Sequence, residues 1–206
     1  MSDTIKQIVF DVGDVLMDFP THAVTAAFAA SDADAALLHR EIFETPEWIA
    51  TNRDMSDANA LKVMLTRLPQ RLHGAAEQVM ARWHEWLTPN EDVNALAGEL
   101  KGLGYGLYIL SNTSGRYFAF CERIPARPLA SGEVLSMEEK LMKPDPALFQ
   151  ILFQRFGLVP GECFFVDDSP LNIDAARWCG MPGCMYRGDI GEVRSALRAR
   201  GVAVAP

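Results

Sequence analysis

An apolar run that ends in a carboxylate constrains this chain more than any other feature. Ile, Val and Phe at residues 8–10 are followed by Asp11, Val12 and Gly13. Such a run, closed by a charge and a glycine, predicts a buried strand that delivers Asp11 to the edge of a sheet. A strand followed by an ordinary Asp/Gly turn is the alternative interpretation. The downstream sequence decides between the two.

Predicted strands and helices alternate through the second half of the chain, which indicates an α/β fold with a parallel sheet. The strands expected at 106–110 and 162–166 both end in polar residues, as the first strand does. Open parallel sheets bind ligands beyond the carboxyl ends of their strands. We therefore expect the residues at these ends to converge on one site: Asp11, Ser111, Asn112, Asp167 and Asp168.

Shorter elements complete this expected core. Short strands are predicted at 128–131 and 184–186, and Asn90 is expected to cap a helix. The apolar period and the chain breakers predict helices over 92–101, 145–156, 171–179 and 191–200.

Between the first strand and residue 88 the apolar pattern is helical, without a strand signal. Four helices are predicted there: 21–30, 33–43, one that Ser56 caps, and 74–87. The sequence thus predicts a core domain, residues 1–16 and 89–206, and a helical cap domain, residues 17–88.

Composition narrows the class of protein. With 206 residues, 49% of them hydrophobic and 22% charged, the chain is long enough for one large core with a smaller insertion. A formal net charge of −8 with scattered basic residues disfavours nucleic-acid and anionic-membrane partners. No secretory signal or membrane-spanning run is recognisable, so we expect a cytoplasmic protein. Its four cysteines are interpreted as small hydrophobic residues rather than disulfides. The sequence leaves the oligomeric state open.

Carboxylates gathered at one sheet edge repel each other unless a cation or protons neutralise them. Mg²⁺ satisfies this requirement, because it takes few carboxylates and keeps several waters. The strand ends therefore predict a magnesium site.

Four short motifs carry a resemblance to a known family. In chain order they are Asp11-Val12-Gly13-Asp14, Ser111-Asn112-Thr113, Lys143-Pro144-Asp145 and Asp167-Asp168-Ser169. Their order, with three of them at strand ends and the Lys143 motif at the start of a helix, resembles the haloacid dehalogenase superfamily, and among its members the branch that contains bacterial α-D-glucose-1-phosphate phosphatase. The resemblance implies a Rossmann-like three-layer αβα core and identifies the helical insertion as a C1-type cap.

The resemblance also implies roles for these residues. Asp11 would attack phosphorus and form an aspartyl-phosphate. Ser111 and Asn112 would hold phosphate oxygens through a hydroxyl and an amide, and Lys143 would balance the charge that grows during transfer. Mg²⁺ would be held by Asp11, the backbone carbonyl of Gly13, Asp168 and, directly or through water, Asp167.

Gly13 departs from the superfamily pattern. Most phosphatases of the superfamily have a second Asp there, which acts as general acid and base, and glycine cannot transfer a proton. We therefore predict a slow or selective Mg²⁺-dependent phosphatase that acts on a small phosphorylated metabolite, a sugar phosphate being one candidate. A 2-haloacid dehalogenase and a non-catalytic binding protein are the alternatives.

Substrate selection is expected in the cap, where residues 44–56 form a polar segment that we interpret as irregular. Trp48, Asn52 and Arg53 are the candidate specificity residues. Trp48 would wall the substrate pocket and Arg53 would meet a second anionic group. A buried interhelical Trp and a surface Arg are the simpler interpretations.

Overall fold

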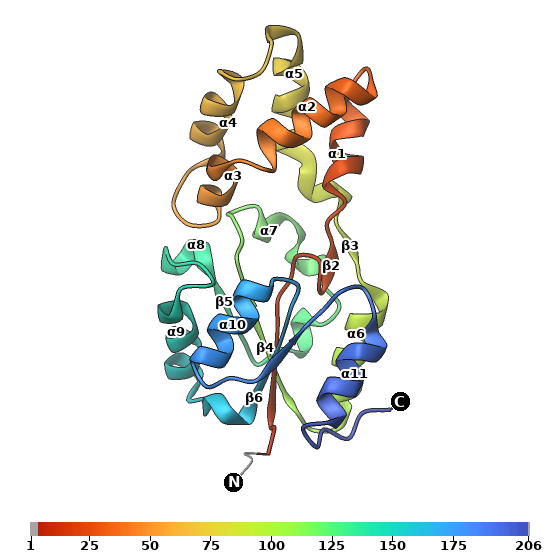
Figure 1. The fold of residues 1–206 in the computed structure, drawn as a ribbon, viewed down its shortest axis with the longest axis vertical. Coiled ribbons are helices and arrows are strands. Elements are labelled where there is room, and N and C mark those ends of the chain that lie inside the picture. Colours follow the sequence, from red (N-terminus) through yellow and green to blue (C-terminus); the bar gives the residue numbers. More distant parts are fainter. Residues whose placement is uncertain (1–3, 206) are drawn as a thin grey trace.

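The central sheet confirms the predicted α/β class. A computed structural model describes residues 4–205, and Figure 1 shows a layered part with a group of helices at one end. The five strands of the sheet run in the order β5-β4-β1-β6-β7, and every pairing is parallel. These strands are β1 (Gln7–Phe10), β4 (Gly106–Ser111), β5 (Gly132–Leu135), β6 (Cys163–Asp167) and β7 (Gly183–Met185).

Helices cover both faces of the sheet. Alternate residues of a strand point to opposite faces, so Ile8 and Phe10 pack in one apolar cluster and Val9 packs in another. The first cluster includes α6 (Glu91–Gly102) and α11 (Ile190–Arg198), and the second includes α9 (Pro146–Phe156) and α10 (Pro170–Trp178). Figure 1 shows the two pairs on opposite sides of the strands. Burial on both faces explains why the strands read as nearly continuous apolar runs.

The helix starts follow local capping chemistry. The Asn90 side chain accepts a hydrogen bond from the Val93 amide at the start of α6. Asp145 caps α9 by accepting from the Ala147 amide at 2.9 Å, and Pro146 occupies the first turn. The helices predicted over 92–101 and 145–156 are confirmed to within one residue at each end.

Strand register brings the motifs together. Phe10 lies opposite Ile109 of β4 and Val166 of β6. The next residue, Asp11, therefore lies between the ends of these two strands, and its amide donates to the Val166 carbonyl at 3.0 Å. The strand ends converge because β1 is the middle strand of the sheet.

The segment between β1 and α6 forms the helical group. Its helices are α1 (Thr21–Phe28), α2 (Asp32–Ile42), α3 (Pro46–Thr51), α4 (Asp57–Leu65) and α5 (His73–Arg82), with 3₁₀ turns η1 (Gln70–Leu72) and η2 (Trp83–Trp86). The prediction of four helices was wrong, because α3 lies in the segment expected to be irregular. Thr45 caps α3 and Pro46 starts it, but six residues are too few to display a helical period.

Two chain crossings join the helical group to the layered part. They pair as a short antiparallel ribbon of β2 (Met17–Asp18) with β3 (Thr88–Pro89). The prediction that residues 17–88 contain no strand was therefore wrong at this ribbon. The predicted domain boundaries, after residues 16 and 88, lie at the ribbon, and the division into core and cap stays a prediction.

One strand is displaced from its predicted position. The sequence predicted a strand at 128–131, but Arg127–Leu129 form a 3₁₀ turn, η4, and β5 begins at Gly132. Pro128 explains the shift, since proline suits the first turn of a helix and donates no hydrogen bond to a sheet. Four short elements complete the fold: α7 (Tyr117–Phe120), α8 (Ser136–Glu139) and the 3₁₀ turns η3 (Cys121–Arg123) and η5 (Pro160–Glu162). None of the helices within residues 4–205 combines the length and apolarity needed to span a bilayer.

Candidate active site

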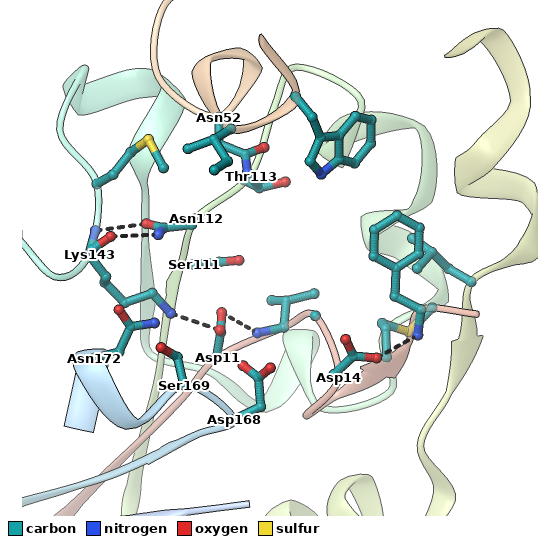
Figure 2. A pocket seen from close by; sticks show the side chains of 18 of the residues that line it. Asp11, Asp14, Asn52, Ser111, Asn112, Thr113, Lys143, Asp168, Ser169 and Asn172 are labelled. Atoms are coloured by element: carbon teal, nitrogen blue, oxygen red, sulfur yellow. Dashed lines mark hydrogen bonds and ion pairs between the residues drawn. The ribbon is translucent and has the colours of Figure 1, made fainter. Parts of the chain in front are cut away.

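A cavity of about 420 Å³ is lined by residues at the carboxyl ends of the strands and by residues of the helical group. Figure 2 shows the side chains of Asp11, Ser111 and Asp168, which follow or end strands of the sheet, pointing into it. The predicted residues that line it are Asp11, Gly13, Ser111, Asn112, Lys143 and Asp168, together with Trp48 and Asn52 from the helical group. The sequence thus located the cavity and most of its polar wall.

Lys143 is the centre of the charged cluster. Its Nζ is fully buried and lies 2.9 Å from Asp11 Oδ2 and 2.6 Å from Asp167 Oδ2. The same nitrogen donates to the Leu110 carbonyl at 2.8 Å. All three donor positions of the ammonium are therefore used. This geometry places the Lys143 ammonium against Asp11 and away from solvent, as a charge-balancing role requires.

Asp167 and Asp168 differ although they are adjacent. Asp167 is fully buried, and its other oxygen, Oδ1, accepts from the Ser169 amide and Asn172 Nδ2, both at 2.9 Å. Both of its oxygens are thus engaged in holding Lys143 and the start of α10. Asp168 is exposed and lines the cavity. Of the two carboxylates, Asp168 is the one open to a ligand.

The cluster holds more negative than positive charge. Burial raises the pKa of Asp11 to about 7, because Asp167 and Asp168 add to the effect and Lys143 only partly opposes it. Burial, Asp167 and Asp14 likewise raise the pKa of Asp168 to about 6. Burial lowers the pKa of Lys143, but the two carboxylates beside it outweigh burial and raise its pKa overall.

The donor set fits a hard divalent cation. One carboxylate oxygen from each of Asp11, Asp167 and Asp168 can be chosen so that all lie within 4.8 Å of one another. Oxygen ligands at this spacing suit Mg²⁺, whose positive charge would relieve the repulsion that raises these pKa values. Asp11 and Asp168 would hold the ion, with Gly13 in the same wall of the cavity.

Ser111 and Asn112 have different surroundings. Ser111 is buried and lines the cavity. Asn112 Oδ1 accepts from the Lys143 amide and its Nδ2 donates to the Lys143 carbonyl, both at 2.8 Å (Figure 2). The amide of Asn112 was predicted to hold phosphate, but the structure shows it clamping the main chain of Lys143. That clamp spans β4 and the loop before α9, so it was not visible in the sequence.

Gly13 leaves space where an acid/base carboxylate is usual. A Cβ built on Gly13 meets no atom within 4 Å, and its φ lies outside the left-handed region. The neighbouring Asp14 does have a left-handed φ of 52°, and its Oδ1 accepts from the Phe19 amide at 3.0 Å. Figure 2 shows Asp14 apart from Asp11 and Asp168. The hydrogen bond to Phe19 thus ties Asp14 to the chain crossing.

Of the three residues that were predicted to select the substrate, two line the cavity and one does not. Trp48 and Asn52 line the cavity. Arg53 does not line it; its Nε lies 3.4 Å from Asp54 Oδ1, and both side chains are about half exposed. Arg53 is thus a surface residue, which is the simpler of the two interpretations that the sequence offered.

Sequence reasoning missed the apolar wall of the cavity. The missed residues are Met17, Phe19, Ile49, Trp83, Leu87, Phe120, Met142 and Leu171. They come from several separate elements and share no local pattern. Asn172 was missed as well: its Nδ2 donates to Asp167 Oδ1, a positioning role that spacing did not reveal.

The fold and site define a class: an α/β enzyme with an acidic side chain at the end of its central strand and a lysine held against it. Residues 5–180 match the family described as haloacid dehalogenase-like hydrolases. The chain belongs to this family. The family-level prediction is confirmed, whereas the finer resemblance to glucose-1-phosphate phosphatase and the C1 type of the cap stay predictions.

Two relatives differ in the reactions that their names describe. (S)-2-Haloacid dehalogenase 4A of Burkholderia cepacia is 24% identical over 186 residues, which cover 85% of this chain and 80% of the relative. Sesquiterpene phosphatase astK of Aspergillus oryzae is 30% identical over 98 residues, which cover 47% of this chain and 50% of the relative.

Among solved structures, a HAD family enzyme of Bacteroides thetaiotaomicron in complex with magnesium and inorganic phosphate has a TM-score of 0.69. It is 20% identical, and the match covers 90% of this chain and 96% of the other. This likeness establishes the shared fold.

Proposed function

We propose that the protein is a Mg²⁺-dependent phosphomonoester hydrolase that acts on a small phosphorylated metabolite through an aspartyl-phosphate. The observation that carries the proposal is the Asp168 carboxylate, which is open to the cavity beside Asp11. An anionic ester would be repelled by this pair, so the site is suited to such a substrate only with a cation.

In the proposed reaction, an oxygen of Asp11 attacks phosphorus and the bond from phosphorus to the alcohol oxygen breaks. The leaving alcohol takes a proton, and water then attacks phosphorus and releases phosphate and the Asp11 carboxylate. Mg²⁺ held by Asp11, Asp168 and the Gly13 carbonyl would neutralise charge on the phosphoryl oxygens. The buried ammonium of Lys143 lies 2.9 Å from the nucleophile and supplies fixed positive charge.

Proton transfer limits the expected rate. Gly13 has no side chain that could transfer a proton, and the Asp14 carboxylate is held by the Phe19 amide. Water or the substrate must therefore supply the proton to the leaving alcohol. General acid and base catalysis typically contributes about 10² to 10⁴ in rate, and we expect a correspondingly slow or selective enzyme.

A 2-haloacid dehalogenase is the second candidate, favoured by relatives such as the Burkholderia cepacia enzyme. Asp11 would then attack carbon and displace halide, without a metal. Asp168 argues against this reaction, because it would stand unneutralised beside the carboxylate of the haloacid. A binding protein without catalysis, the third candidate, is favoured only by the missing side chain at Gly13.

Parallel assays separate the three candidates. The purified protein is given p-nitrophenyl phosphate with Mg²⁺ or with EDTA, and separately chloroacetate with EDTA. The proposal expects ester hydrolysis that needs Mg²⁺ and no halide release. Halide release without metal would establish the dehalogenase instead, and inactivity in every assay would leave the binding protein.

A further inference from the structure

The candidate active-site cavity has two chemically different ends. Three of the charged side chains that line it within the described chain, Asp11, Lys143 and Asp168, lie together at one end, whereas Asp14 lies apart and is held by the Phe19 amide. The phosphoryl group of the proposed substrate belongs at this end, against Asp11.

The other end is walled by aromatic rings. Trp48 and Trp83 of the helical group meet edge to face, with ring centroids 5.3 Å apart. Phe19, at the chain crossing, lies 5.1 Å from the Trp83 ring and 6.0 Å from the Trp48 ring, and Phe120 of α7 lies 6.1 Å from Trp83. Because these rings pack against one another, they form a fixed wall rather than mobile side chains.

Few polar groups accompany these rings. Among the described residues of the helical group and its crossings, Asn52 is the one cavity-lining side chain that bears an amide, and the Trp48 and Trp83 indoles add N–H donors. A sugar carries several hydroxyl groups, each of which loses affinity when it is buried without a hydrogen-bond partner. An alkyl or aryl group has no such requirement and gains from burial against the rings.

The rim of the cavity is apolar as well. Ile49 of α3 and Leu171 of α10 both line it, and they are 55% and 66% exposed. Large apolar side chains at this exposure, facing one opening from two separate elements, are characteristic of a ligand-binding groove. Ile49 follows Trp48 in α3, so the apolar lining extends from the aromatic wall to an exposed side chain at the opening.

We propose that the substrate is the phosphate ester of an apolar alcohol, with its alkyl or aryl group on the aromatic wall formed by Phe19, Trp48, Trp83 and Phe120. This proposal rests on the proposed phosphatase function and specifies the substrate class for the same site. It replaces a sugar with an alkyl or aryl group as the organic part of the ester.

A series of esters with similar primary alcohol leaving groups tests the substrate class. We would measure kcat/KM in Mg²⁺ for methyl, butyl and hexyl phosphate and for glucose 6-phosphate. The proposal expects kcat/KM to rise about two- to fourfold with each added methylene that becomes buried. Hexyl phosphate should exceed glucose 6-phosphate by at least about tenfold. A flat dependence on chain length, or a preference for the sugar ester, would overturn it.

Rim variants supply the matched control. Leu171→Ser and Ile49→Ser should each lower the hexyl-to-methyl ratio of kcat/KM several-fold. Trp178→Ser should leave this ratio unchanged, because Trp178 lies at the far end of the same helix as Leu171, is 78% exposed and does not line the cavity. Equal effects of all three substitutions would refute the rim's role.

Binding without turnover separates the two proposals. Calorimetry in Mg²⁺ should show tighter binding of hexylphosphonate than of methylphosphonate, neither of which can be hydrolysed at phosphorus. If this preference holds but no ester is hydrolysed, the phosphatase proposal fails and the apolar site stands. If esters are hydrolysed without a chain-length preference in either measurement, the apolar site fails and the phosphatase proposal stands.

Discussion

Replacing Asp11 with Asn is expected to stabilise the metal-free protein at neutral and alkaline pH while it abolishes turnover. Asp11 is buried, and its pKa rises from an ordinary 3.8 to about 7 in the folded protein. The folded state therefore binds more protons than the unfolded state between these two pH values. By linkage, the contribution of Asp11 makes stability fall as pH rises through this window.

The magnitude follows from the same values. A change in pKa from 3.8 to about 7 corresponds to roughly 4 kcal/mol against the ionised form once pH exceeds 7. Asn cannot ionise, and its Oδ1 retains an acceptor for the Val12 amide, which donates to Asp11 Oδ1 at 2.7 Å. Its Nδ2 replaces Oδ2, which lies 2.9 Å from Lys143 Nζ, so the ammonium loses one acceptor at every pH. Lys143 keeps Asp167 and the Leu110 carbonyl as partners. Relative to its difference from wild type below pH 4, where the lost acceptor makes it slightly less stable, the variant should thus gain up to roughly 4 kcal/mol above pH 7.

Urea unfolding in EDTA, followed by circular dichroism, measures this difference. Between about pH 5 and about pH 8, the advantage of Asp11→Asn over wild type should grow by roughly 2 to 3 kcal/mol. Asp174→Asn, at a side chain 73% exposed on α10, is the control and should show no such growth. An advantage that stays constant with pH, or a variant less stable than wild type at alkaline pH, would refute the reasoning.

Three further substitutions test separate parts of the site. Lys143→Met should lower the free energy of unfolding by about 3 to 5 kcal/mol in urea, because it leaves two buried carboxylates unpaired; a loss below about 1 kcal/mol would contradict the buried cluster. Asp168→Asn should weaken Mg²⁺ binding in calorimetry by at least about tenfold, whereas unchanged affinity would remove Asp168 from the metal site. Gly13→Asp should raise the ratio of the alkyl phosphate rate to the p-nitrophenyl phosphate rate by about tenfold or more, because the p-nitrophenyl leaving group needs little protonation. An unchanged ratio of the two rates would show that proton transfer does not depend on this position.

The polar part of the site was predictable because it depends on topology. Once strands and helices alternate, the carboxyl ends of parallel strands must share one edge, so Asp11, Ser111 and Asp168 meet whatever the details of the loops. The roles of neighbouring residues were not predictable in this way. Asp167 turns toward Lys143 while Asp168 lines the cavity, and this difference depends on the buried position of one ammonium group.

The apolar part of the site escaped prediction for a different reason. Phe19, Trp83 and Phe120 belong to a chain crossing, a 3₁₀ turn and a short helix, and they meet only when the helical group packs over the sheet. Periodicity reports which face of one element is apolar, but it does not report which elements share a cavity. The short helix α3 escaped for the related reason that six residues carry too little pattern.

Identification of the group carried by Asp11 during turnover tests the central claim most directly. The protein is mixed with Mg²⁺ and an alkyl phosphate, quenched in acid within the first turnovers, digested with pepsin and examined by mass spectrometry. The account predicts a phosphoryl group on Asp11 in wild type and none in Asp11→Asn. Unmodified Asp11 throughout active ester hydrolysis, or a phosphoryl group on another residue, would contradict it.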